Sequence, residues 1–188
     1  RENRTNLDCP ERSPPFKTYE RVWSNTFQKV FDELGKGDSD KAAKQCMLKM
    51  GHREPFLETT KAVECLRASG QFLLAVLSNS DNATLNPQLE TLSLTFDAVL
   101  SSESAGMYKP DPRIFRQMLD MLGVEAMNSL YVGDSQSDDI QGAKLAGMQV
   151  AWLNRNGTQL NQTLPNPDYV LGNLLELLDI LNIPREVS

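Results

Sequence analysis

The stretch that decides the fold is residues 129–153, which read SLYVGDSQSDDIQGAKLAGMQVAWL. Its first apolar run predicts a strand at 129–133 that ends in Gly133-Asp134, and its second predicts a strand at 149–153. Between the two, residues 138–146 have the three- and four-residue apolar spacing of a helix. Short apolar strands joined by a helix are typical of a parallel sheet, so this stretch predicts an α/β fold.

The same alternation of strands and helices continues on both sides of this stretch. The apolar pattern predicts strands at 72–77, 97–100 and 168–171 and helices at 56–69, 82–92, 112–122 and 173–182. Asp111-Pro112 marks one helix start most clearly, since Asp is favoured at the N-cap and Pro at the first helical position. The predicted fold class is a Rossmann-like parallel sheet with flanking helices, occupying residues 53–188.

Residues 1–52 have a different pattern. Apolar residues recur at helical spacing over 19–34, with Thr18 as the expected N-cap and Gly35 as the expected end of the helix. A second helix is expected to begin with Ser39 as its N-cap. The two helices predict a helical hairpin that precedes the sheet.

The composition excludes several classes of protein. Of the 188 residues, 40% are hydrophobic and 23% are charged, which is typical of a globular domain and excludes a disordered chain. Lys and Arg number 19 against 25 Asp and Glu, a net charge of −6 without a dense basic run, so we expect no nucleic-acid partner. The longest apolar runs are too short to cross a bilayer, so we expect no membrane association.

The cysteines indicate a reducing compartment. Cys9, Cys46 and Cys65 are odd in number and lack CxxC spacing, which favours neither a disulfide framework nor a zinc site. We therefore expect a cytoplasmic protein.

Chemistry is expected at the carboxyl ends of the predicted strands, where open α/β sheets bind their ligands. The strand at 72–77 ends in Ser78-Asn79, the strand at 129–133 ends in Gly133-Asp134, and Lys109 lies between them in the sequence. A Ser hydroxyl and free backbone N–H groups bind anions, a Lys adds positive charge, and carboxylates are oxygen ligands for Mg²⁺. These residue types together suit phosphoryl transfer.

Three motifs in this order resemble those of a known family. They are Leu77-Ser78-Asn79, then Tyr108-Lys109-Pro110-Asp111-Pro112, then Val132-Gly133-Asp134-Ser135 continuing to Asp139-Ile140, with Gly142-Ala143 and Ala146-Gly147-Met148 behind it. The pattern resembles the haloacid-dehalogenase-like hydrolase superfamily over about residues 53–172. The hairpin over residues 1–52 is similar to part of the helical cap of these enzymes.

The resemblance implies roles for the first two motifs. Ser78 would donate a hydrogen bond to an oxygen of the transferring phosphoryl group, with the Asn79 backbone N–H nearby. Lys109 would neutralise the charge of the phosphoryl group and of the attacking aspartate. The substrate class implied is a small phosphorylated metabolite.

The third motif carries the implied metal site. Asp134 would ligate Mg²⁺ directly. Two carboxylates compete for the supporting role: Asp139 would hold a metal-bound water or Lys109, whereas Asp138 would cap the following helix.

The family's mechanism needs a fourth motif, which this sequence lacks in its expected form. In the family a strand near the amino terminus ends in Asp-x-Asp, whose first Asp attacks phosphorus to form an aspartyl-phosphate and whose second is the general acid and base. Asp38-Ser39-Asp40 follows no apolar strand, and Asp8 is a poorer match. The resemblance implies that the nucleophile strand lies outside residues 1–188, that it belongs between the strands at 72–77 and 129–133, and that residues 1–188 alone are inactive.

Three functions are open at this point. The first is Mg²⁺-dependent hydrolysis of a phosphomonoester. The second is hydrolytic dehalogenation of a 2-haloacid, against which Gly133-Asp134 argues, since dehalogenases resembling this fold work without metal and lack this pair. The third is a non-catalytic binding or regulatory chain that keeps the fold without its nucleophile.

Overall fold

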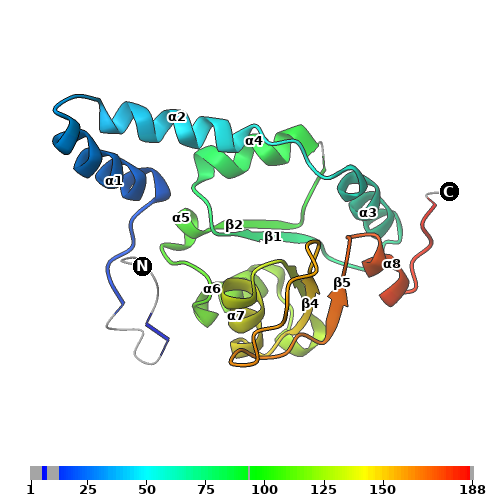
Figure 1. Cartoon of the computed structure of the whole chain (residues 1–188). Helices are drawn as coiled ribbons and strands as arrows, with labels where there is room; N and C mark the ends of the chain where they lie inside the picture. The colour runs from blue at the N-terminus through cyan, green and yellow to red at the C-terminus, as the bar shows by residue number, and fades with distance from the viewer. Residues whose placement is uncertain (1–5, 8–12, 93, 187–188) are drawn as a thin grey trace.

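The computed structural model describes residues 6–7, 13–92 and 94–186. From β1 to β4 each strand is separated from the next by at least one helix, whereas β5 follows β4 directly (Figure 1). In chain order the elements are α1 (Tyr19–Leu34), α2 (Ser39–Gly51), α3 (Leu57–Ala68), β1 (Ala75–Ser78), α4 (Asn82–Leu92), β2 (Ala98–Ser101), α5 (Ser102–Ala105), α6 (Pro112–Leu122), η2 (Ala126–Asn128), β3 (Leu130–Gly133), η3 (Gln136–Ile140), α7 (Gln141–Leu145), β4 (Gln149–Leu153), β5 (Tyr169–Leu171) and α8 (Glu176–Ile180). The predicted α/β class, with parallel strands and flanking helices, is confirmed.

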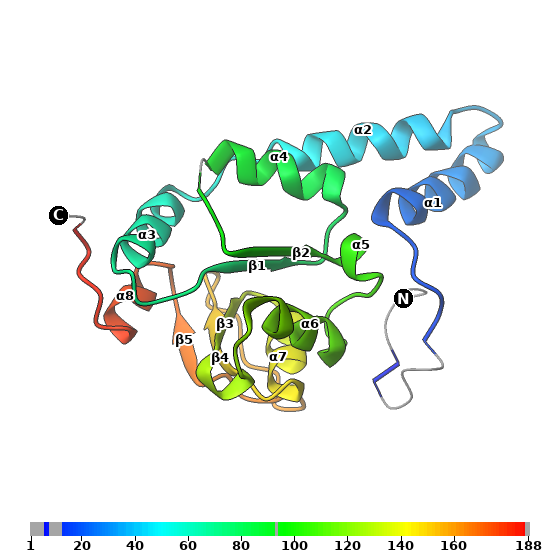
Figure 2. The same ribbon diagram turned by 180° about the vertical axis from the view of Figure 1, so that it is seen from behind.

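The strands form two parallel groups. β1 pairs with β2, with Ala75 opposite Ala98, whereas β3 pairs with β4 and β4 with β5. Within residues 13–92 and 94–186, no strand pairs with the second edge of β1 or of β3. Figures 1 and 2 show the β1–β2 pair between α4 on one side and the β3–β4–β5 group on the other. The sheet is therefore divided between β1 and β3.

The hydrophobic core surrounds α6. Ile114 and Phe115 are 0% and 1% exposed and pack with residues of β2, β4 and α7. Gly142 permits this packing, because a Cβ at that position would lie 2.3 Å from the Phe115 ring. Asp111 caps α6 as predicted, by accepting the Arg113 backbone N–H at 3.0 Å. Burial acts to raise the pKa of Asp111, but hydrogen bonds from Arg113 outweigh it and hold that pKa below its ordinary value.

The helical hairpin forms where the sequence predicts it, with one difference at its second helix. Thr18 caps α1 as predicted, and Gly35 in the left-handed conformation ends it. The prediction that Ser39 caps α2 is wrong, since the N-cap is Asp38, whose carboxylate accepts a backbone N–H of the first turn at 3.0 Å. The Ser39 hydroxyl instead donates to Gln28 of α1 at 2.9 Å, so the preceding carboxylate takes the cap.

The hairpin is tied to loops of the sheet. Both carboxylate oxygens of Asp81 accept backbone N–H groups at the start of α1, from Tyr19 and Glu20, each at 2.8 Å. The Tyr108 hydroxyl donates to the Lys17 carbonyl at 2.7 Å. α2 also packs along α4, as both views show (Figure 2). The first turn of α1 is thus fixed to the loops that follow β1 and precede α6.

Two further findings concern the compositional expectations. Cys46 and Cys65 are free thiols, and Cys9 lies outside the described residues. None of the helices in the described part of the chain has both the length and the apolar character needed to span a bilayer.

Candidate functional site

Segments from three parts of the chain meet at Lys109. Its Nζ lies 2.6 Å from Asp139 Oδ1, beyond β3, and 3.4 Å from the Leu77 carbonyl oxygen, near the end of β1. The Lys109–Asp139 ion pair is largely withdrawn from solvent, with side chains 10% and 5% exposed. Charges in such surroundings are weakly screened, so the two groups attract each other more strongly than an exposed pair would.

Asn79 fixes the backbone of the lysine rather than pointing into solvent. Its Oδ1 accepts the Lys109 backbone N–H at 2.8 Å, and its Nδ2 donates to the Lys109 carbonyl at 3.1 Å. The peptide bond that follows Lys109 is cis. The loop after β1 therefore positions the loop that carries the lysine, which explains why these two motifs occur together.

Asp139 uses both of its carboxylate oxygens. Oδ1 accepts from Lys109, and Oδ2 accepts the Ser135 backbone N–H at 2.9 Å. Gly133 leaves room for this side chain, because a Cβ at position 133 would lie 2.4 Å from Asp139 Cγ. Asp139 thus forms an ion pair with Lys109, which is one of the two partners that the resemblance implies for Asp139.

Asp134 is the carboxylate that remains available. It is exposed, its carboxylate makes no hydrogen bond or ion pair within the described residues, and its carbonyl accepts from Trp152 Nε1 at 3.1 Å. No group of three or more Asp, Glu, His or Cys side chains in the described ranges could hold a metal ion. Mg²⁺ commonly takes only one or two protein carboxylates, together with substrate oxygens and waters, so Asp134 fits as one ligand of such an ion.

Ser78 and Asp138 have local partners. The Ser78 Oγ accepts from Ser80 Oγ at 3.0 Å and keeps its own hydrogen for another acceptor. The expectation that Asp138 caps the following helix is wrong, because the Ser135 Oγ is the cap and accepts the Asp138 backbone N–H at 3.1 Å. Ser135 lies two residues beyond β3 and directly precedes η3, which is the N-cap position.

Tyr131, which sequence reasoning passed over, lies inside this cluster. Its hydroxyl is 2.9 Å from Lys109 Nζ and 3.0 Å from Asp139 Oδ1. Burial, followed by the negative charge of Asp139, raises the pKa of the Tyr131 phenol well above its ordinary value. The available signal was its position two residues before Gly133, because alternate residues of a strand point to the same face.

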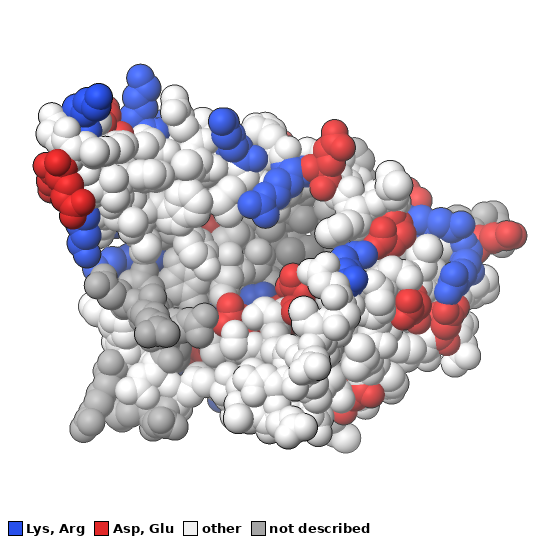
Figure 3. Space-filling view, viewed as in Figure 1, with Lys and Arg blue, Asp and Glu red and all other residues white. Residues whose placement is uncertain are grey.

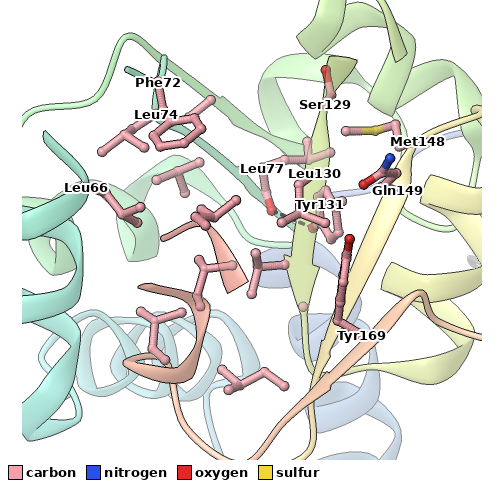
Figure 4. Close-up of a pocket in the computed structure, with 18 of the residues that line it drawn as sticks. Leu66, Phe72, Leu74, Leu77, Ser129, Leu130, Tyr131, Met148, Gln149 and Tyr169 are labelled. Atoms are coloured by element: carbon pink, nitrogen blue, oxygen red, sulfur yellow. Dashed lines mark hydrogen bonds between the residues drawn. The ribbon is translucent and has the colours of Figure 1, made fainter. Parts of the chain in front are cut away.

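A large cavity separates β1 from β3. Its volume is about 1180 Å³ and its lining is mainly apolar, with Leu77 from β1 and Leu130 and Tyr131 from β3 (Figure 4). Asp134, just beyond β3, also lines it. The space-filling view shows a hollow across the face seen in Figure 1, bordered by acidic and basic side chains (Figure 3). The unpaired strand edges therefore border an apolar space beside the cluster around Lys109.

The carboxylates that match the Asp-x-Asp motif poorly are bound elsewhere in the structure. Asp38 caps α2, and Asp40 accepts a hydrogen bond from Ser24 within the hairpin. Neither contacts Lys109, Ser78 or Asp134 through any hydrogen bond of the described residues. Asp8 lies outside the described residues.

We predict that Gly133→Ala displaces Asp139 and destabilises the fold. The new methyl group would overlap the Asp139 side chain at 2.4–2.5 Å, so either the strand end or the ion pair must move. Overpacking of this kind costs about 1–3 kcal/mol, measurable by urea unfolding. Gly172→Ala is the matched control, because its Cβ would meet only the flexible end of Glu176, at 3.2 Å. Equal stability of the two variants would contradict the close approach of Gly133 to Asp139.

Comparison with known proteins relates this arrangement to a family. Residues 11–153 match the family model described as haloacid dehalogenase-like hydrolase. The N-acylneuraminate-9-phosphatase of Homo sapiens is 34% identical over 111 residues, covering 57% of this chain and 45% of that protein. An (S)-2-haloacid dehalogenase 2 of Pseudomonas sp. (strain CBS-3) is 31% identical over 131 residues, covering 69% of this chain and 56% of that protein.

A solved structure shares the fold. A HAD hydrolase of Bacillus subtilis bound to magnesium superposes with a TM-score of 0.76 at 25% identity, covering 89% of this chain and 74% of that one. This chain spans about half the length of the curated relatives named above. The matched family model covers most of the chain, and the solved structure shares its fold: the chain belongs to the haloacid dehalogenase-like hydrolase family.

Proposed function

We propose that this chain is part of a Mg²⁺-dependent phosphomonoester hydrolase that acts through an aspartyl-phosphate on a small phosphorylated metabolite in the cytoplasm. The observation that carries the proposal is a buried Lys109–Asp139 pair bound to the backbone N–H of Ser135, the residue next to the exposed Asp134, whose carboxylate makes no hydrogen bond or ion pair within the described residues. A fixed cation, together with a metal ion that a free carboxylate would hold, offsets the negative charge that develops in phosphoryl transfer. The phosphatase among the relatives supports the same reaction.

Lys109 is proposed to bind the phosphoryl group by exchanging one of its partners. Its ammonium has three hydrogens, and Asp139, Tyr131 and the Leu77 carbonyl accept at 2.6, 2.9 and 3.4 Å. The Leu77 contact is the longest and the weakest of the three. A phosphoryl oxygen would replace that carbonyl, while the other two contacts hold the amine in place.

Ser78 and Asp134 are proposed to complete the site. The Ser78 hydroxyl has a hydrogen to donate to a second phosphoryl oxygen, because its contact with Ser80 uses only a lone pair. Asp134 would hold Mg²⁺, which when bound supplies a positive charge for the phosphate oxygens. Asn79 acts on the site through the Lys109 backbone that it binds.

The attacking carboxylate is proposed to come from a strand that pairs with both β1 and β3. Three observations support this: each of the two strands has an edge without a partner in the described residues, the space between them is an apolar cavity of about 1180 Å³, and Asp134 lines that cavity. A strand inserted there would carry its final residues to the carboxyl ends of its neighbours. The described residues by themselves would then lack the attacking group.

We predict that the full-length protein releases phosphate from an aryl phosphate only with Mg²⁺, and that Asp134→Asn weakens the dependence on Mg²⁺ and the turnover together. Loss of one of the few protein ligands lowers affinity for an ion that dehydrates reluctantly. The measurement is phosphate release beside halide release from a 2-haloacid, each with Mg²⁺ and with excess EDTA. Asp138→Asn is the matched control, since that side chain accepts only from its neighbour Ser137.

The same assay separates the alternatives. Halide release that survives EDTA, without phosphate release, would establish a dehalogenase. The haloacid dehalogenase among the relatives is the reason to test this alternative. Release of neither product would favour a non-catalytic binding chain. Either result would contradict the phosphatase proposal.

A further inference from the structure

We propose that Tyr131 is a positioning residue that fixes the side chains of Lys109 and Asp139 relative to each other for the reaction. This inference rests on the proposed function. The Tyr131 Oη lies 2.9 Å from Lys109 Nζ, 3.0 Å from Asp139 Oδ1 and 3.3 Å from the Leu77 carbonyl oxygen. One hydroxyl group therefore touches both members of the buried ion pair and the end of β1.

The direction of each hydrogen bond follows from the groups involved. A lysine ammonium only donates, an ionised carboxylate only accepts, and a phenol donates one hydrogen while accepting through its lone pairs. Lys109 therefore donates to the Tyr131 oxygen, and Tyr131 donates to Asp139, the nearer of its two acceptors. The three side chains form a closed ring in which each contacts the other two, since Lys109 also donates to Asp139 at 2.6 Å.

The ring of Tyr131 is itself held in place. It packs edge-on against Phe115, with centroids 5.0 Å apart and an interplanar angle of 69°, and Phe115 is only 1% exposed. The Lys109 Nζ also lies 5.5 Å from the centroid of the tyrosine ring. A side chain fixed by the core on one side presents its hydroxyl at a constant position, as preorganised sites require.

Tyr131 fixes the direction in which Lys109 can donate a hydrogen bond to substrate. With Asp139 and Tyr131 as the two short contacts, the remaining hydrogen points toward the end of β1, where the Leu77 carbonyl accepts it at 3.4 Å. Without the phenolic oxygen the ammonium could rotate, and this direction would no longer be fixed. The hydroxyl therefore acts through Lys109 and has no contact with substrate of its own.

The kinetic test is a double-mutant cycle in the full-length protein with an aryl phosphate. We expect Tyr131→Phe to lower kcat about tenfold with KM changed by less than about twofold, because a group that orients Lys109 affects mainly the transition state. In a Lys109→Met background the same substitution should change kcat by less than about twofold. Tyr169→Phe is the control for removal of a hydroxyl, since Tyr169 is 37% exposed and its hydroxyl makes no hydrogen bond within the described residues. Equal effects of Tyr131→Phe in both backgrounds would overturn the proposal.

A second readout does not depend on turnover, so failure of the proposed function remains distinguishable. In a lysine-selective ¹H–¹⁵N spectrum of the full-length protein, we expect a slowly exchanging ammonium signal that Lys109→Met removes. Tyr131→Phe should broaden or abolish that signal while Tyr169→Phe leaves it unchanged. A wild-type protein that releases no phosphate but shows this pattern would refute the phosphatase and retain the positioning role. An ammonium signal unaffected by Tyr131→Phe would refute the positioning role.

Discussion

Lys109→Met in the full-length protein should lower kcat for an aryl phosphate by about 10²–10³, the scale for loss of one preorganised electrostatic group. Lys109 is the cation of a cluster whose ion pair is only 10% and 5% exposed, so solvent replaces its charge poorly. Phosphate release at saturating substrate and Mg²⁺ measures the effect. Met keeps the apolar part of the side chain and removes the charge.

Lys144→Met is the matched control for this substitution. Lys144 also forms an ion pair, with Asp168 at 2.5 Å, but its side chain is 24% exposed. Asp168 also accepts the Val150 backbone N–H, which places this pair near the start of β4. We expect kcat within about twofold of wild type, since exposed ion pairs contribute little. Comparable losses in Lys109→Met and Lys144→Met would show that lost charge pairing, rather than chemistry, explains the first result.

Asp139→Ala should reduce the free energy of unfolding by about 3–5 kcal/mol, the usual cost of leaving one member of a buried ion pair without its partner. Lys109 would lose its shortest contact, and the Ser135 backbone N–H would lose its acceptor. Urea unfolding measures the change, and Asp138→Ala, which removes a carboxylate that accepts only from Ser137, is the control.

A compensating variant separates the buried charge from general loss of packing. Lys109→Met combined with Asp139→Leu replaces both charges with apolar side chains, and such replacements are often neutral or stabilising. We expect the double variant to recover most of the stability lost in Asp139→Ala. A double variant as unstable as Asp139→Ala, or an Asp139→Ala cost below about 1 kcal/mol, would contradict the buried pair.

The order of strands and helices could be predicted because it depends on local apolar spacing. The strand at 149–153 and the helix at 112–122 coincide with β4 and α6. The predicted helix at 138–146 is instead divided into η3, a π-helical turn in which the Ile140 backbone N–H donates to the Ser135 carbonyl five residues earlier, and α7. Apolar spacing does not distinguish one wider turn of this kind from an ordinary helical turn.

The short elements and the long-range contacts were not predictable in this way. α5 and η2 have four and three residues, too few for any periodicity to appear. Tyr131 occupies an ordinary strand position, and only the fold brings its hydroxyl to Lys109, 22 residues away in sequence. Motif order pointed to Lys109, Ser78, Asn79, Asp134 and Asp139, but the partner of each came from tertiary structure.

The central claim, phosphoryl transfer through an aspartyl-phosphate, is tested most directly by trapping that intermediate. The full-length protein is mixed with an aryl phosphate labelled in its phosphoryl group, quenched in acid within milliseconds, and mapped by peptide mass spectrometry. The account predicts a hydroxylamine-labile phosphoryl group on an aspartate other than Asp38 or Asp40, with less accumulating in Lys109→Met. Phosphate release without any labelled aspartate, or a label on Asp38 or Asp40, would contradict it.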